Sequence, residues 1–142
     1  MKLFFKANNL KELESKRLIL LETVNTHFDR YEDQFLDDRI WTYLYEKEIV
    51  EKGYRNWVQK VMKLSSQNVD KLFSIYSKQY DEIVGLIRLH NISKKHCKAE
   101  IITIIFYNRQ GQGFGGLVNL ILYCLINMLV RNLRFSCRFP LK

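Results

Sequence analysis

Four of the six glycines in the 142-residue chain fall between residues 111 and 116, in the stretch NRQGQGFGGL (residues 108–117). Glycine tolerates positive φ and lets a ligand approach the backbone without a Cβ in the way. Because a candidate helix follows at once, the loop would present unpaired backbone N–H groups and the positive end of a helix dipole to one point. This arrangement suits a phosphate or pyrophosphate, although such a turn can also be only a tight connection.

Two familiar phosphate loops do not match this stretch. A Walker-type loop ends in Gly-Lys-Ser/Thr, whereas Gly115 is followed by Gly116 and Leu117, with no lysine. A dinucleotide-binding fold places its glycine turn after the first strand, with an acid about 20 residues further on. Here several candidate strands precede the turn and no acidic residue follows Glu100. Both types of loop are therefore excluded.

The apolar pattern predicts the elements that would hold this loop. A continuous apolar run in residues 17–24 predicts a buried first strand, and apolar spacing predicts two helices between residues 25 and 62. Three β-rich runs, at residues 71–77, 82–92 and 99–107, predict consecutive antiparallel strands. A helix, apolar on nearly every face, is predicted over residues 117–132; it is shorter than the ~20 residues of a membrane span, which favours a core helix. The fold class is therefore α+β.

Charge and cysteine content limit the function classes. Residues 1–82 carry 14 basic and 14 acidic side chains, whereas residues 83–142 carry nine basic ones against Glu100 alone. This excess is typical of a solvated basic face, a polyanionic cofactor or a nucleic-acid ligand. The three cysteines form no CxxC pair and no zinc-like spacing with the histidines, and the N-terminus does not resemble a signal peptide. We therefore expect reduced thiols, no metal site and a cytoplasmic protein.

The letters QGQGFG (residues 110–115) resemble the acetyl-coenzyme A loop of the GCN5-related N-acetyltransferases, whose pattern is Gln/Arg-x-x-Gly-x-Gly/Ala between a strand and a helix. ESKRLILLETV (residues 14–24) resembles the E-x-x-R-L-x-L-R opening strand of the ribosomal-protein-type branch. Residues 83–113 are similar to the third and fourth strands of that branch, without a gap from Glu100 to Gly113. The resemblance covers nearly the whole chain from about Leu13.

The resemblance implies a mixed, mostly antiparallel sheet flanked by helices, acetyl-coenzyme A as cosubstrate, and a primary amine, on a protein N-terminus or a small molecule, as acceptor. It implies that backbone N–H groups hold the pyrophosphate and that the preceding strand pairs with the pantetheine amides. The pyrophosphate residues are Gln110, Gly111, Gln112, Gly113, Phe114, Gly115 and Gly116, and the strand residues are Ile104, Ile105 and Phe106. Arg109 is the nearest cation to this loop.

The resemblance also suggests roles on the acceptor side. Glu100 corresponds to a glutamate that is catalytic in some members, so we predict it as the general base; a carboxylate bonded to neighbouring donors is the alternative. Trp41 and Tyr43 match an aromatic pair that lines the acceptor groove, or they pack between helix and sheet. Single histidines such as His90 are more often surface residues than proton shuttles.

The chain departs from the family at its C-terminal end. After the predicted helix, RFSCRFPLK (residues 134–142) supplies at most one further strand, and the last strand-helix-strand portion of the family fold is lacking. We therefore expect residues 1–142 to form a single, truncated acetyltransferase domain with weak cofactor binding and impaired turnover. Two alternatives stay open: a small basic nucleic-acid-binding domain, and an interaction module that inserts its apolar helix into a partner or a bilayer.

Overall fold

A computed structural model describes residues 6–9, 12–42, 47–93, 95, 98–118 and 134–138 of the chain. Its strands are β1 (Lys6–Asn9), β2 (Glu12–Glu14), β3 (Leu18–Glu22), β4 (Lys71–Ser77), β5 (Glu82–Ser93), β6 (Lys98–Ile105) and β7 (Arg134–Arg138). Its helices are α1 (Asn25–Arg30), α2 (Glu32–Leu36) and α3 (Lys47–Ser66), with short 3-10 turns η1 (Asp38–Ile40) and η2 (Tyr107–Arg109). Residues 114–118 form a further helical segment directly after the glycines.

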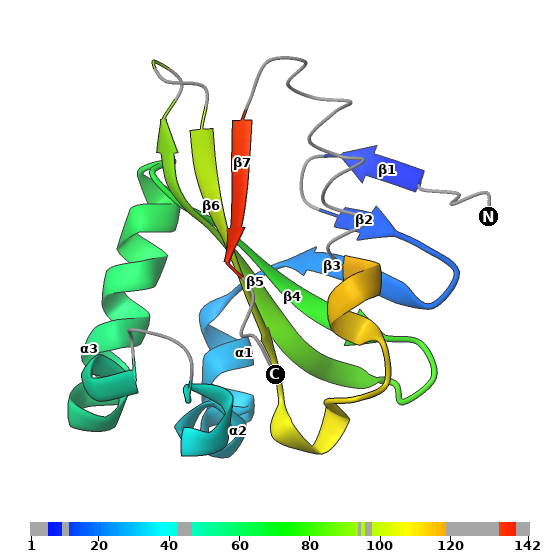
Figure 1. Ribbon diagram of the computed structural model, residues 1–142, viewed down its shortest axis with the longest axis horizontal. Coiled ribbons are helices and arrows are strands. Elements are labelled where there is room, and N and C mark those ends of the chain that lie inside the picture. The colour runs from blue at the N-terminus through cyan, green and yellow to red at the C-terminus, as the bar shows by residue number, and fades with distance from the viewer. Residues whose placement is uncertain are drawn as a thin grey trace.

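The strands form one twisted sheet in which neighbours in sequence are neighbours in space, from β1 to β7 (Figure 1). Every pair is antiparallel except β6 and β7, which run parallel. The expected α+β class, with a mostly antiparallel sheet flanked by helices, is confirmed. The stretch RFSCRFPLK does supply one more strand, β7, next to β6.

Most predicted strands are found where the pattern placed them. The run at residues 71–77 is β4, and the next two runs are β5 and β6. The run at residues 17–24 is a buried strand, β3, but the prediction that it is the first strand was wrong. Because β1 (KANN) and β2 (ELE) are short and polar, their sequences carry no apolar alternation that would predict them.

Two apolar clusters cover the two faces of the sheet. The helix-side cluster packs α1, α2 and α3 against one face, and its buried members are Phe28, Phe35, Ile40, Trp41, Tyr54, Trp57, Val61, Leu72, Ile83, Leu86, Ile104 and Phe106. The loop-side cluster packs the helical segment 114–118 against the other face, and its buried members are Leu18, Leu20, Phe73, Ile75, Val84, Ile87, Leu89, Ile101, Phe114 and Val118. Figure 1 shows the helices and the segment at opposite sides of the sheet.

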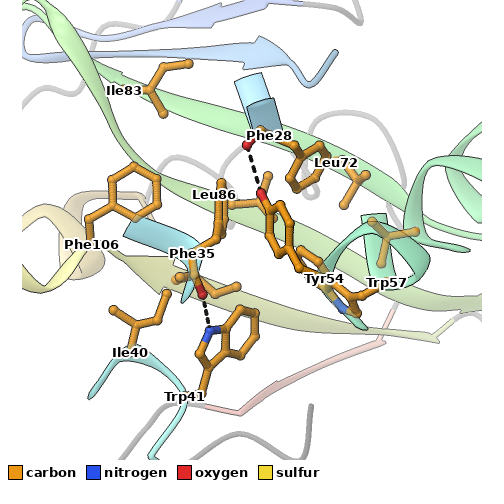
Figure 2. Packing of buried hydrophobic residues seen from close by; sticks show 12 residues of the cluster. Phe28, Phe35, Ile40, Trp41, Tyr54, Trp57, Leu72, Ile83, Leu86 and Phe106 are labelled. Atoms are coloured by element: carbon orange, nitrogen blue, oxygen red, sulfur yellow. Dashed lines mark hydrogen bonds between the residues drawn. The ribbon is translucent and has the colours of Figure 1, made fainter. Parts of the chain in front are cut away.

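Aromatic rings fill the helix-side cluster (Figure 2). Phe35 packs edge-on against Phe106, with ring centroids 5.0 Å apart. Tyr54 donates its hydroxyl hydrogen to Phe28 O over 2.8 Å, and Trp41 donates its indole N–H to Phe35 O over 2.6 Å. Burial raises the pKa of Tyr54 well above its usual range. Both polar tips thus have partners inside the cluster, which satisfies them away from water.

Gly85 permits the close approach of β5 and β6. A Cβ at this position would lie 2.1 Å from Ile104 O, closer than any carbon can approach a carbonyl oxygen. The register between β4 and β5 shifts at the same place, leaving Val84 as an extra residue on β5. The backbone of β6 therefore presses against β5 at the end of the strand that leads into the glycines.

His27 connects α1 to the sheet. Its Nδ1 lies 2.8 Å from Ser74 Oγ of β4, and Ser74 Oγ lies 3.0 Å from Thr23 Oγ1. The Val24 N–H points to the same His27 nitrogen, at 3.5 Å. Since Nδ1 accepts in this arrangement, the neutral ring fits it. Burial and the charge of Arg30 lower the pKa of His27 below the ordinary value of 6.5.

Within the described part of the chain, no helix combines the length and the apolar composition needed to cross a bilayer. Most of the predicted apolar helix, residues 119–132, lies outside the described residues.

Candidate functional site

The glycine loop, residues 110–116, connects the end of β6 and η2 to the helical segment 114–118. Gly111 and Gly113 have φ angles of +78° and +80°, which non-glycine residues seldom adopt. Leu117 donates its backbone N–H to Gly113 O, the first helical hydrogen bond. The backbone N–H groups that follow Gly113 therefore belong to the first turn of a helix, where intrahelical partners are lacking.

The described residues leave the Cβ positions of the four loop glycines free. A Cβ built at Gly111, Gly113, Gly115 or Gly116 would meet no atom of the described residues within 4 Å. This differs from Gly85, where the neighbouring strand fills that space. The described residues therefore leave room for a ligand on the Cβ side of these glycines, and packing among the described residues does not require four glycines here.

The helical segment is nevertheless firmly held to the sheet. Phe114 is 2% exposed and Val118 is fully buried in the loop-side cluster. Arg17 lies over the Phe114 ring, 5.5 Å from its centroid, and Tyr80 contacts the same ring edge-on. The loop is thus an open backbone between two fixed ends, β6 and the Phe114 side chain.

Arg109, the cation nearest the loop, contacts the turn between β4 and β5 and the first residue of β5. Its Nε and Nη2 donate to Glu82 Oε1 over 2.8 and 2.5 Å. Its guanidinium also lies 3.7 Å from the centroid of the Tyr80 ring. The charge of Arg109 is therefore matched by Glu82, and the loop offers a ligand its backbone N–H groups rather than this guanidinium.

The end of β6 next to the loop has one backbone edge turned to β5 and one turned to β7. Phe106 donates its N–H to Val84 O over 2.9 Å, and Ile104 O faces Gly85 of β5. By the alternation of an antiparallel strand, the N–H and C=O of Ile105 point the other way, toward β7. Of the three strand residues predicted to pair with pantetheine, only Ile105 turns its backbone groups to that side; the N–H of Phe106 is already used.

Among the described residues, only the first part of β6 pairs with β7. Described pairs between the two strands run from Lys98↔Arg134 to Ile102↔Arg138, which leaves Ile105 beyond the last of them. The carbonyl of Ile105 accepts a hydrogen bond of 3.1 Å from the side-chain amide of Gln110. An amide donor thus already occupies the strand edge at which a pantetheine amide was predicted.

Glu100 is the third residue of β6 and is half-buried, opposite His90 of β5 and Ser136 of β7. Its side chain shares a face with Ile102 and Ile104, because every second residue of a strand points the same way. Ile104 belongs to the helix-side cluster, so Glu100 faces the side of the sheet that carries α1 to α3.

A buried polar group that the sequence did not predict contacts His90, the residue opposite Glu100 on β5. Asp70, which is fully buried, accepts a hydrogen bond of 2.7 Å from Arg88 Nε. Its two carboxylate oxygens each lie 3.2 Å from His90 Nδ1. His90 is therefore part of an ordered cluster rather than a free surface residue. A charged Arg88 within the apolar run EIVGLIRLHNI was the available sequence signal.

The remaining predicted residues fall in different places. Trp41 is 1% exposed and packs edge-on against Trp57, which is the packing role that the sequence left open. Tyr43 lies outside the described residues. Tyr80 of the β4–β5 turn contacts Gln112 of the loop, and Glu82, the first residue of β5, contacts Arg109 just before the loop; no motif would predict these contacts.

Solved acetyltransferase structures share this architecture. The RimL ribosomal L7/L12 α-N-protein acetyltransferase in complex with coenzyme A matches with a TM-score of 0.73 at 20% identity, over 87% of this chain and 71% of that chain. A GNAT-family acetyltransferase from Bacillus anthracis matches with a TM-score of 0.69 at 17% identity, over 89% of this chain and 72% of that chain. The fold is that of the GCN5-related N-acetyltransferases.

A third structure with this N-acetyltransferase fold is the Salmonella typhimurium acetyltransferase that modifies the N-terminal serine of ribosomal protein L7/L12. It matches with a TM-score of 0.68 at 19% identity, over 87% of this chain and 71% of that chain. No protein-family model and no curated protein sequence matches the chain. At these identities the likeness extends to the fold, and the activity has to be argued from the residues.

Proposed function

We propose that the glycine loop and the adjoining edge of β6 bind acetyl-coenzyme A, and that the chain transfers the acetyl group to a primary amine. The observation that carries this proposal is the open backbone at Gly111, Gly113, Gly115 and Gly116, directly before a helical turn. Backbone N–H groups at such a position suit a pyrophosphate. The coenzyme A complex of RimL, a protein of the same fold, supports this choice of ligand.

The edge of β6 supplies the second part of the proposed site. Ile105 turns its N–H and C=O away from β5, so an extended ligand with amide groups can pair there as an added strand. The side chain of Gln110 now donates to Ile105 O, so a pantetheine amide would replace this contact. Recognition by backbone groups on a strand and a loop needs no charged side chain.

Acetyl transfer requires a neutral amine. Acetyl-coenzyme A supplies a thioester, whose carbonyl carbon the amine nitrogen attacks; the bond to sulfur breaks, coenzyme A leaves as its thiolate, and the thiolate takes up the proton that the attacking nitrogen releases. An ammonium group carries no lone pair, so its proton must first leave. We propose Glu100 as the acceptor of this proton, because its half-buried carboxylate lies on β6, the strand that would hold the cosubstrate.

The proposed acceptor is a protein N-terminus or a small amine. Two of the matching acetyltransferases act on ribosomal protein L7/L12 according to their descriptions. Asp33 and Asp38 of this chain are exposed on the α1–α2 side of the sheet, the same side as Glu100. Exposed carboxylates there would attract a cationic amine.

Thermal unfolding tests whether acetyl-coenzyme A is the ligand of the chain. The melting temperature of the chain should rise with saturating acetyl-coenzyme A and stay unchanged with ATP, which carries similar charge but no pantetheine. Equal shifts with both ligands, or none with acetyl-coenzyme A, would overturn the proposal.

Release of free coenzyme A thiol in the presence of amines tests the reaction separately. The Glu100→Gln variant should keep the melting-temperature shift but lose transfer by about 100-fold. Transfer by this variant at the wild-type rate would remove Glu100 from the mechanism and leave ligand binding unaffected.

A further inference from the structure

Tyr80 of the β4–β5 turn and Glu82, the first residue of β5, contact the glycine loop and the residue just before it. Tyr80 donates its hydroxyl hydrogen to Gln112 Oε1 over 2.7 Å. Its ring stacks under the Arg109 guanidinium at 3.7 Å, and Arg109 is in turn bonded to Glu82. We call these four residues, Tyr80, Glu82, Arg109 and Gln112, the turn clamp. They join two segments about 30 residues apart in sequence.

The turn that carries the clamp makes hydrogen bonds of its own. The Tyr80 N–H donates to Ser77 Oγ over 3.3 Å, and Asp81 adopts a φ of +52°. The Lys78 N–H donates to Arg17 O of the loop before β3. Arg109 and Glu82 are half-buried, with side chains 23% and 33% exposed, so solvent weakens their pairing less than it would on an open surface.

The position of Gln112 in the loop indicates what the turn clamp does. Gln112 lies between Gly111 and Gly113, the two residues of the loop with positive φ. Glycine has the largest conformational freedom of any residue, so this segment would sample many backbone states if nothing held it. The clamp fixes the single side chain between the two glycines and, through Arg109, the residue just before the loop.

We propose that Tyr80 is a positioning residue of the glycine loop: its hydroxyl and its ring hold Gln112 and Arg109 so that the loop backbone is already arranged before a ligand binds. For the identity of the ligand, this inference rests on the proposed function. Preorganisation raises affinity because the entropy of ordering the loop is not lost on binding. Tyr80 itself need not touch the ligand.

The Tyr80→Phe variant tests the clamp. It keeps the ring that contacts Arg109 and Phe114 and removes only the hydrogen bond to Gln112. Amide hydrogen exchange of residues 107–118, measured without ligand, should become at least about fivefold faster, while exchange in β4 and β5 stays unchanged. The dissociation constant for acetyl-coenzyme A should rise by about fivefold, the effect expected for one hydrogen bond.

Tyr76→Phe is the matched control. Tyr76 donates its hydroxyl hydrogen to Asp81 Oδ1 in the same turn but has no described contact with the loop. This variant should leave both the exchange of residues 107–118 and the dissociation constant unchanged. A double variant, Tyr80→Phe with Gln112→Ala, should bind acetyl-coenzyme A no more weakly than Gln112→Ala alone, because the two groups act through one bond.

Several results of these measurements would contradict the proposed role of Tyr80. Unchanged exchange in Tyr80→Phe, or equal changes in Tyr76→Phe, would overturn the clamp. Faster exchange with an unchanged dissociation constant would overturn its role in positioning. If the wild-type chain does not bind acetyl-coenzyme A, the proposed function fails, and the exchange measurement alone still shows whether Tyr80 holds the loop.

Discussion

On the helix side of the sheet, seven aromatic residues pack against one another, whereas after the end of β6 the chain enters a loop whose four glycines have no atom of the described residues within 4 Å of their Cβ positions. The aromatic residues are Phe28, Tyr31, Phe35, Trp41, Tyr54, Trp57 and Phe106. Phe106 belongs to both regions, because its ring packs in the cluster and its backbone leads into the loop.

The two regions are expected to serve different properties of the protein: the helix-side cluster its stability, and the glycine loop its ligand binding. The helix-side cluster buries its aromatic rings against one another, so its residues should matter for folding. The glycine loop buries only Phe114 and exposes its backbone, so its residues should matter for binding. Substitutions in the two regions are expected to affect different measurements.

The largest effect is expected inside the cluster. Phe35 is 2% exposed and contacts four aromatic rings, those of Phe28, Tyr54, Trp57 and Phe106. Phe35→Ala should lower the free energy of unfolding by about 4 kcal/mol, measured by chemical denaturation. Its neighbour Leu36 is 44% exposed, and Leu36→Ala should change the value by only about 0.5 kcal/mol. Similar losses in both variants would show that the cluster is not closed.

A slightly smaller loss is expected where β5 meets β6. In Gly85→Ala the new Cβ would meet Ile104 O at 2.1 Å, and the strands must move apart, which should cost about 3 kcal/mol. Gly53→Ala in α3 is the control, since its Cβ would meet only the flexible side chain of Asn56 at 3.3 Å. If Gly85→Ala unfolds at the wild-type denaturant concentration, the close approach of the strands is not as described.

A smaller, pH-dependent effect is expected at His27. Because its pKa in the folded chain is lower than 6.5, the unfolded chain binds more protons as the pH falls below that value. This contribution to stability is present above pH 6.5 and is lost as the pH falls toward the lowered pKa. Denaturation at several pH values should show this decline in the wild type and a weaker one in His27→Asn. An identical pH dependence in both proteins would exclude His27 as the cause.

Much of the fold was predictable, because β4, β5 and β6 are long and apolar and the glycines stand out in a chain with few of them. The short strands β1 and β2 carry no comparable pattern. The candidate site was predictable as a loop but not as a contact network. Nothing in the letters around Tyr80 and Glu82 indicates that this turn folds against residues about 30 positions later, because such contacts depend on the register of the sheet.

The sequence also could not predict toward which neighbouring strand the backbone N–H and C=O groups of each β6 residue point. Ile104, Ile105 and Phe106 form one apolar run, and only the register with β5 shows that the groups of Ile105 turn to the other side. In the same way, the sequence predicted Trp41 and Tyr43 equally as substrate contacts. The burial of Trp41 became evident only from its packing against Trp57. A shared motif places residues near a site without fixing which atoms face it.

Calorimetric titration of acetyl-coenzyme A into the wild type, Gly115→Leu and Gly115→Ala tests most directly whether the open loop is a ligand site. A Cβ at position 115 meets no described atom within 4 Å, so Gly115→Ala should unfold like the wild type, and the denaturation midpoint of Gly115→Leu shows separately whether the longer side chain is accommodated. We expect the leucine side chain to block the loop and to weaken binding by at least about tenfold, whereas alanine, which the resembled pattern accepts there, should leave the affinity nearly unchanged. Equal affinity of Gly115→Leu and the wild type, or no binding by the wild type, would contradict this expectation.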